Sequence, residues 1–186
     1  MQIIGFGHRR RVGKDTAAKF LVTFLRQEGK YNHIMKAGFA DKLKAQCYEL
    51  YKWAGLQYGD WYEEPGNEHM KDTILPAIGK SPRQIWIEYG QLVREIYPGT
   101  WTHFLFNRNN VDLLIVKDVR KIDEAESILE VGGACIRIDR PDVPISDDVV
   151  DSALANWDRW TAIIKNEGSH QLLYDEVVAL AGRLNL

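Results

Sequence analysis

The chain has 186 residues, which predicts a single domain because domains usually contain about 100 to 200 residues. With 45% hydrophobic and 27% charged residues, a chain of this size can bury roughly 70% of its extended surface, which excludes a largely disordered protein. The 24 Lys and Arg against 26 Asp and Glu give a formal charge of -2, which excludes a global basic field for nucleic acid or anionic lipid. Any anion site must therefore be local.

Hydrophobic periodicity predicts strands that alternate with helices. In chain order, the expected elements are a strand at 2–6, a helix at 14–28, a strand around 33–36, a helix at 42–53, a helix at 82–97, a helix carrying 101–106, a strand at 111–116, a helix at 123–131, a strand at 134–138, a strand at 161–164 and a helix at 169–184. This alternation predicts one α/β domain over 1–186, with a mainly parallel sheet and helices on both faces. Segments 55–80 and 140–150 are rich in loop-forming residues, and we expect them to be mobile.

The two cysteines and the apolar runs indicate the compartment. Cys47 and Cys135 form no C-x-x-C pair, so we expect two reduced thiols rather than a disulfide framework or a zinc site. No apolar run reaches the roughly 20 residues that a membrane-spanning helix needs. We therefore expect a soluble, cytoplasmic protein, and no membrane partner.

A glycine-rich loop separates the first strand from the first helix. It reads GHRRRVGKDT from Gly7 to Thr16, and in this context backbone N–H groups and the positive helix end converge on phosphate while the lysine reaches the outer phosphates. The pattern G-x4-G-K-[ST] would place its leading glycine at His8. The loop therefore either holds one extra residue after Gly7 or turns at His8 itself. The alternative is a solvated, Arg-rich turn before an ordinary helix.

The residues around Lys14 leave two further questions open. Asp15 follows Lys14 where a magnesium-binding hydroxyl is usual, so we expect Thr16 or Asp15 to hold the metal, directly or through water. Each of the three consecutive arginines either meets phosphate or is a plain surface charge. They are Arg9, Arg10 and Arg11.

Further charged residues are expected where strands and helices end. Asp118 and Arg120 terminate the strongest apolar strand, so both side chains should emerge at the ligand edge of the sheet, unless they form only a structural pair. Arg83 and Arg94 lie three helical turns apart, which predicts one cationic stripe or a plain exposed face. The tryptophans are expected in the core more often than on a ligand. The five histidines show no metal-ligand spacing and are expected in surface or loop positions.

No Ser/His/Asp triad is present, which suits phosphoryl transfer because that reaction needs positioning and charge neutralisation more than a nucleophilic side chain. A phosphate monoester acceptor has a second pKa near 6 and is already largely ionised at neutral pH, so no general base is required. Several arginines around a phosphate loop therefore fit a kinase for a monophosphate better than one for a neutral hydroxyl.

These residues resemble the deoxynucleoside monophosphate kinases of tailed bacteriophages, within the P-loop nucleoside monophosphate kinase group. The resemblance covers nearly the whole chain, and its most specific pieces are the Gly-Lys-Asp-Thr ending of the loop and Asp118-Val119-Arg120 followed by Glu124-Ala125. The other matching segments are Phe39-Ala40-Asp41-Lys42-Leu43-Lys44, Ser81-x-Arg83 with Gly90 and Arg94, Trp101, Gly132-Gly133, Arg140-Pro141 and Asn166-Glu167-Gly168-Ser169.

The resemblance implies a three-layer P-loop kinase fold and transfer of the γ-phosphoryl group of ATP, with Mg²⁺, to a deoxynucleoside monophosphate. The implied catalytic residues are Lys14, Asp118 and Arg120. The expected ATP-binding residues are Arg11, Gly13, Lys14, Asp15, Thr16, Arg140 and Asn166. The expected acceptor-binding residues are Lys42, Arg83, Arg94, Trp101, Asp118 and Arg120. The expected partners are small-molecule nucleotides and no nucleic acid, for a monomer or homodimer located in the host cytoplasm if the source is viral.

The chain departs from the family pattern at three places. The loop is one residue longer, Ile87 stands where the family often has glutamine, and Val150-Asp151 replaces the usual Ser-Glu. Two other functions remain open. One is a P-loop kinase for another small acceptor of the dephospho-coenzyme A or phosphomevalonate type, with Asp15 or Asp118 as a base. The other is a module that binds ATP without transferring phosphate. In a kinase, segments 55–80 and 140–150 are expected to close over the nucleotides and exclude water.

Overall fold

A computed structural model describes residues 1–144 and 152–186, which form two compact units. The sheet unit comprises Met1–Gly38 and Arg108–Leu186, and the helical unit comprises Phe39–Asn107. Much of the segment expected to be mobile at 140–150, and the Val150-Asp151 departure, lie outside the described residues. The expectation of a single domain stays a prediction.

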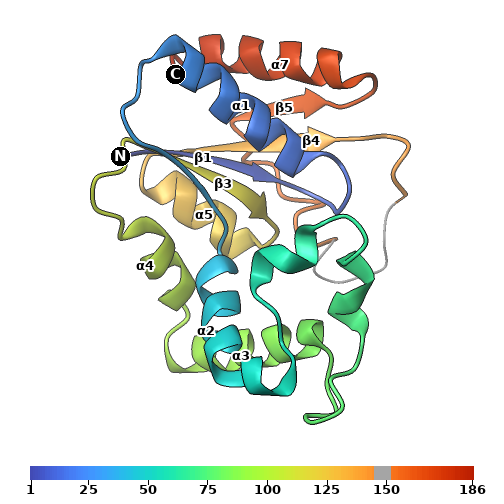
Figure 1. The fold of residues 1–186 in the computed structure, drawn as a ribbon. Helices are drawn as coiled ribbons and strands as arrows, with labels where there is room; N and C mark the ends of the chain where they lie inside the picture. The colour runs from blue at the N-terminus through green and yellow to red at the C-terminus, as the bar shows by residue number, and fades with distance from the viewer. Residues whose placement is uncertain (145–151) are drawn as a thin grey trace. The chain divides into compact units, whose positions relative to one another are not determined.

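The sheet unit is built on five parallel strands in the order β2-β3-β1-β4-β5 (Figure 1). The strands are β1 (Gln2–Gly7), β2 (Ile34–Ala37), β3 (Leu113–Val119), β4 (Ala134–Asp139) and β5 (Ala162–Lys165). Helices α1 (Lys14–Glu28) and α7 (His170–Arg183) cover one face, and α5 (Ile122–Glu130) covers the other (Figure 1). The expected α/β fold, with a parallel sheet and helices on both faces, is confirmed.

The apolar run in β3 lies in the core of the sheet unit. Four consecutive residues of this central strand, Leu113 to Val116, are fully buried because helices cover both faces of the sheet. On the α1 and α7 side, Leu21, Val177 and Leu180 pack with the sheet residues in one cluster. On the α5 side, a Cβ at Gly5 would lie 2.6 Å from Cδ1 of Ile128, so the strand requires a glycine there.

The helical unit contains three α-helices and three short 3₁₀ turns among the described residues. They are α2 (Asp41–Tyr51), η1 (Lys52–Ala54), η2 (Gly59–Glu63), η3 (Glu68–Asp72), α3 (Pro82–Ile96) and α4 (Thr100–Phe106). The expected helix start at Ser81-Pro82 is confirmed, because the Ser81 hydroxyl accepts from the Gln84 N–H and the Gln84 side chain accepts from the Ser81 N–H.

Segment 55–80 is packed within the helical unit. Leu56 and Tyr62 are each only 1% exposed and join a core cluster with Leu43, Cys47 and Ile85. Two 3₁₀ turns and an isolated antiparallel bridge between Leu75 and Lys80 organise the remainder. The mobility of this segment stays a prediction.

Two further properties concern the helices and the thiols of the described residues. None of their helices is both long enough and apolar enough to span a bilayer. Cys47 and Cys135 are buried free thiols, and burial raises the pKa of Cys47 to about 11 and of Cys135 to about 12. Both thiols are therefore protonated and unreactive at neutral pH.

Candidate phosphate-binding site

The loop between β1 and α1 ends in an uncapped helix N-terminus. Gly13 occupies the N-cap position in a left-handed conformation (φ 100°) and has no side chain with which to cap the first turn of α1. The first N–H groups of an α-helix lack intrahelical partners, and the helix dipole makes this end positive. The start of α1 therefore offers backbone donors to an anion, as the sequence predicted.

His8, rather than Gly7, adopts the backbone conformation of the leading glycine in this loop. Its φ is 100°, in the left-handed region that favours glycine, whereas Gly7 is absent from the residues with positive φ. Gly7 instead meets a packing requirement, because a Cβ there would lie 2.8 Å from the Trp160 ring. His8 thus takes the conformation of the leading glycine. His8 lies in the loop, one of the two positions expected for the histidines, but it is only 4% exposed because its ring packs against β4.

Lys14 is held inside the loop. Its side chain is 5% exposed, and its ammonium donates to the His8 carbonyl at 3.0 Å and to the Arg9 carbonyl. The same ammonium lies 3.4 Å from Oδ1 of Asp118 on β3. The loop and the central strand thereby fix one positive charge beside the N-terminus of α1.

Asp118 and Arg120 form a second pair at the carboxyl end of β3. Arg120 Nε lies 2.8 Å from both carboxylate oxygens of Asp118. Burial alone would raise the pKa of Asp118, but Arg120 and Lys14 outweigh burial and hold that pKa below its ordinary value. The structure thus brings Lys14, Asp118 and Arg120 together as the sequence predicted, with Asp118 ionised.

Asn166 and Arg140 occupy different settings in the sheet unit. The amide of Asn166 is 9% exposed and donates to the Val12 carbonyl at 2.9 Å, and a Cβ at Gly13 would lie 2.6 Å from its Nδ2. Asn166 therefore holds the end of the loop in place through its hydrogen bond to Val12 and its close packing against Gly13. Arg140 forms three hydrogen bonds with the exposed carboxylate of Asp142. Their contacts with ATP stay predictions.

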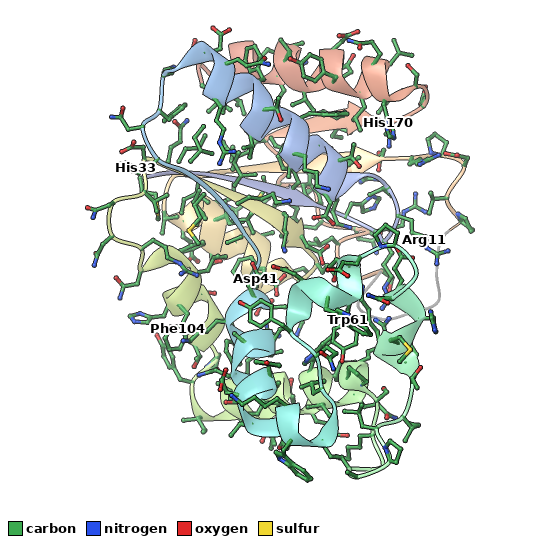
Figure 2. All side chains as sticks on the ribbon, in the orientation of Figure 1. Arg11, His33, Asp41, Trp61, Phe104 and His170 are labelled. Atoms are coloured by element: carbon green, nitrogen blue, oxygen red, sulfur yellow. The ribbon has the colours of Figure 1, made fainter. Side chains whose placement is uncertain are left out.

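The loop arginines differ in how they are held. Arg9 donates through an Nη atom to the Val143 carbonyl at 3.1 Å, which ties the loop to the segment after β4. Arg11 has a φ of 59°, and its side chain is exposed on the loop (Figure 2). An exposed guanidinium can turn toward a phosphate without breaking a buried contact, so Arg11 remains the arginine predicted to meet ATP.

Four of the six residues predicted to hold the acceptor lie in the helical unit, whereas Asp118 and Arg120 belong to the sheet unit. Arg83 forms a two-pronged pair with Asp72, at 2.6 and 3.2 Å, and Arg94 is half-buried on the same helix. Trp101 is buried at 3% exposure, and its indole N–H donates to the Gly90 carbonyl, so it is a core residue of this unit.

Lys42 is the remaining acceptor candidate in the helical unit. Its ammonium lies 5.3 Å from the ring centroid of Phe104, which projects from α4 (Figure 2). This cation–π contact keeps the lysine beside an exposed ring. The acceptor roles of all four residues stay predictions.

The residues predicted for magnesium offer suitable donors. Thr16 and Asp15 stand in the first turn of α1, half-buried and exposed respectively. The described residues contain no cluster of three His, Cys, Asp or Glu side chains for a metal. Mg²⁺ needs no such cluster, because it binds one or two oxygen ligands together with substrate phosphates and waters. The hydroxyl and the carboxylate therefore fit Mg²⁺ in kind.

Two charged residues at the end of β4 were missed in the sequence. Asp139 Oδ1 accepts from Arg137 Nε at 2.7 Å and lies 3.0 Å from Nδ1 of His8. Gly7 of β1 pairs with Arg137 in the parallel register, so this end of β4 lies beside the phosphate loop. The rule that singled out Asp118 and Arg120, that charged residues at strand ends face the ligand edge, would also have found this pair.

No protein-family model matches the chain. It is 25% identical, over 96% of its length and 95% of the other protein's, to a protein of Acanthamoeba polyphaga mimivirus described as "Putative deoxynucleotide monophosphate kinase". Shikimate kinases from Aquifex aeolicus vf5 and Acinetobacter baumannii, the latter in complex with shikimate, are each 15% identical, with TM-scores of 0.45 and 0.49. These matches cover 99% and 100% of this chain, and 99% and 96% of theirs.

The strand order, the glycine loop and the buried lysine together define the class of the protein. A parallel sheet with helices on both faces (Figure 1), in which β1 runs through such a loop into α1, is the three-layer α/β fold that the sequence predicted.

Proposed function

We propose that this protein transfers the γ-phosphoryl group of ATP to a deoxynucleoside monophosphate, giving the diphosphate. The observation that carries the proposal is the placement of Lys14, with Asp118 and Arg120 beside it, at the uncapped start of α1. Such a site neutralises phosphate charge, which is what this reaction demands of a protein. The description of the viral relative supports the choice of acceptor.

In the proposed reaction, the N–H groups at the start of α1 and the Lys14 ammonium bind the outer phosphates of ATP. Lys14 exchanges the Arg9 carbonyl for a phosphate oxygen and keeps its contacts with the His8 carbonyl and Asp118. Arg120, oriented by Asp118, binds the acceptor phosphate as a two-pronged donor. Thr16 and Asp15 would hold Mg²⁺, which supplies further charge neutralisation on the phosphates.

The low pKa of Asp118 favours an acceptor that is already ionised. A hydroxyl acceptor needs a general base, and an effective base has a pKa near the working pH. Asp118 is held below its ordinary pKa by two cations, which makes it a poor base. A monophosphate, with its second pKa near 6, needs no proton removed at neutral pH.

The test is coupled ADP release by the purified protein with each common deoxy- and ribonucleoside monophosphate, and with shikimate, dephospho-coenzyme A and phosphomevalonate as other acceptors. We expect turnover with at least one deoxynucleoside monophosphate and a loss of about 100-fold or more in Lys14→Ala. Lys19→Ala, which removes an exposed lysine from the same helix, is the matched control.

Results other than the expected turnover would favour one of the other functions or remove the proposed site. Turnover only with a hydroxyl acceptor supports the other small-acceptor kinase. ATP binding in calorimetry without turnover on any acceptor supports the non-catalytic module. Equal rates for wild type and Lys14→Ala remove the proposed site. Single substitutions of Arg83, Arg94, Trp101 and Lys42, with acceptor KM as the readout, test their predicted roles.

A further inference from the structure

His8 stands in a backbone conformation that residues with a Cβ rarely adopt. Its φ of 100° matches that of Gly13 at the other end of the loop. Its side chain is nevertheless almost fully buried, so the ring is part of the fold rather than a tolerated surface substitution. Such a conformation persists only where the surroundings over-determine it.

Three neighbours fix the imidazole. Its Nδ1 lies 3.0 Å from Oδ1 of Asp139 and 3.3 Å from the Ile138 carbonyl. Both partners are acceptors, so Nδ1 carries a proton and donates whether the ring is neutral or charged. The Trp160 ring approaches edge-on, at 6.4 Å between ring centroids. Arg137 in turn holds Asp139, so the ring is anchored to the end of β4.

The backbone of this anchored residue carries an acceptor for Lys14. The His8 carbonyl accepts from the Lys14 ammonium at 3.0 Å, and the His8 N–H donates to the Val119 carbonyl at 3.3 Å. One residue therefore joins β4, β3 and the lysine. Loss of the ring contacts would free the His8 peptide to rotate, and the lysine would lose a fixed partner.

We propose that His8 is a positioning residue for Lys14, which it presents to ATP by clamping the opening of the phosphate loop to Asp139. The inference rests on the proposed function only in that it requires ATP to bind this loop. A loop already in its bound shape avoids an ordering cost when ATP binds, so the clamp contributes to affinity. Bound triphosphate can itself order the loop, so the chemical step depends less on the clamp.

The experiment measures ATP affinity by calorimetry in wild type, His8→Gly, Asp139→Ala and the double variant, with ATP KM and kcat alongside. Glycine keeps the backbone conformation and removes only the clamp. We expect each single variant to weaken ATP binding about tenfold, and the double variant to lose no more than about tenfold, because both remove one interaction. The kcat at saturating ATP should change less than about threefold.

His8→Asn provides a rescue that a merely structural role would not predict. Asparagine tolerates positive φ, and its Nδ2 is as many bonds from Cα as histidine Nδ1, so it can donate to the same acceptors. We expect it to recover most of the affinity lost in His8→Gly. This variant also keeps the test decisive if Asp139→Ala does not fold.

The chain supplies a matched control at the other end of the sheet. His33 and Asp112 form an exposed pair at 3.9 Å, just before β2 and β3 begin. His33→Gly and Asp112→Ala should leave ATP affinity unchanged. Unchanged affinity in His8→Gly, additive losses in the double variant, or failure of His8→Asn to rescue would each overturn the inference. ATP binding without phosphoryl transfer removes the proposed function alone, whereas absence of ATP binding in wild type overturns both.

Discussion

Lys14 and Asp118 lie 3.4 Å apart, and Asp118 holds Arg120 at the same time, so a single carboxylate orients two cations at one end of the sheet. A second carboxylate, Asp139 on β4, likewise contacts Arg137 and His8, on the other side of β1 from β3. These two acidic side chains at strand ends connect the phosphate loop to β3 and β4. In the proposed reaction Lys14 and Arg120 bind phosphate, and the two carboxylates determine where the side chains that they contact point.

Asp118→Asn tests the first of these pairs. The amide keeps the size of the side chain but loses the negative charge and one of the two acceptor oxygens, so its hold on Lys14 and Arg120 weakens. We expect kcat/KM to fall about 100-fold, because a small displacement of a catalytic group has an effect of that size. Steady-state kinetics with the best acceptor measures it, and Asp112→Asn is the control. Loss of less than about threefold would show that Asp118 does not orient the cations.

His8 gives the protein a pH-dependent stability. Burial lowers the pKa of His8, and the positive charges of Arg137 and Arg9 lower it further. The Asp139 carboxylate opposes these effects without restoring the ordinary value of about 6.5. Below pH 6.5 the unfolded chain therefore binds this proton more readily than the folded protein. The contribution of His8 is complete above pH 6.5 and is lost as the pH falls further.

Urea unfolding at pH 7.5, 6.5 and 5.5 measures this dependence. We expect the free energy of unfolding to fall over this range in wild type, and to fall less in His8→Asn, which does not titrate. His33→Asn, which removes an exposed histidine, should behave as wild type. Parallel curves for wild type and His8→Asn would contradict the prediction.

The fold could be read from the sequence because its signals are local. The apolar run of β3 and the capping residues at Ser81-Pro82 each predicted an element that the structure contains. Boundaries shifted by a few residues: the strand expected at 111–116 runs from Leu113 to Val119. The shift places Asp118 inside the strand, where its backbone is fixed by the sheet.

The site could be predicted only in part, because its support comes from distant segments. Lys14, Asp118 and Arg120 follow from strand ends and the loop motif. The burial of His8 depends on Ile138, 130 residues away, and local sequence gives no sign of that contact. In the same way, Asp72 meets Arg83 because an irregular segment folds back onto α3, which no periodic pattern encodes.

Asn166→Asp tests the support behind the loop. The Asn166 Nδ2 atom donates to the Val12 carbonyl at 2.9 Å, and an aspartate would place an oxygen against that carbonyl. The lost hydrogen bond and the added negative charge near the phosphate site should weaken ATP binding about tenfold, or about 1.4 kcal/mol. Calorimetry measures the change, with Asn109→Asp, at an exposed position, as the control. Equal ATP affinity in both variants would refute a supporting role.

Gly90→Ala tests the packing of the helical unit. A Cβ at Gly90 on α3 would lie 2.5 Å from Cδ1 of Leu43 on α2, and the Gly90 carbonyl accepts from the buried indole of Trp101. The added methyl group must displace the packed Leu43 side chain, which we expect to lower the free energy of unfolding by about 1 to 3 kcal/mol. Gly182→Ala is the matched control, because Gly182 lies in α7 with no atom within 4 Å of its added Cβ. That variant should be neutral or more stable by up to about 1 kcal/mol, since alanine favours the helix. Urea unfolding of both variants distinguishes the two effects, and a Gly90→Ala protein as stable as wild type would show that the Leu43 side chain can move aside without cost.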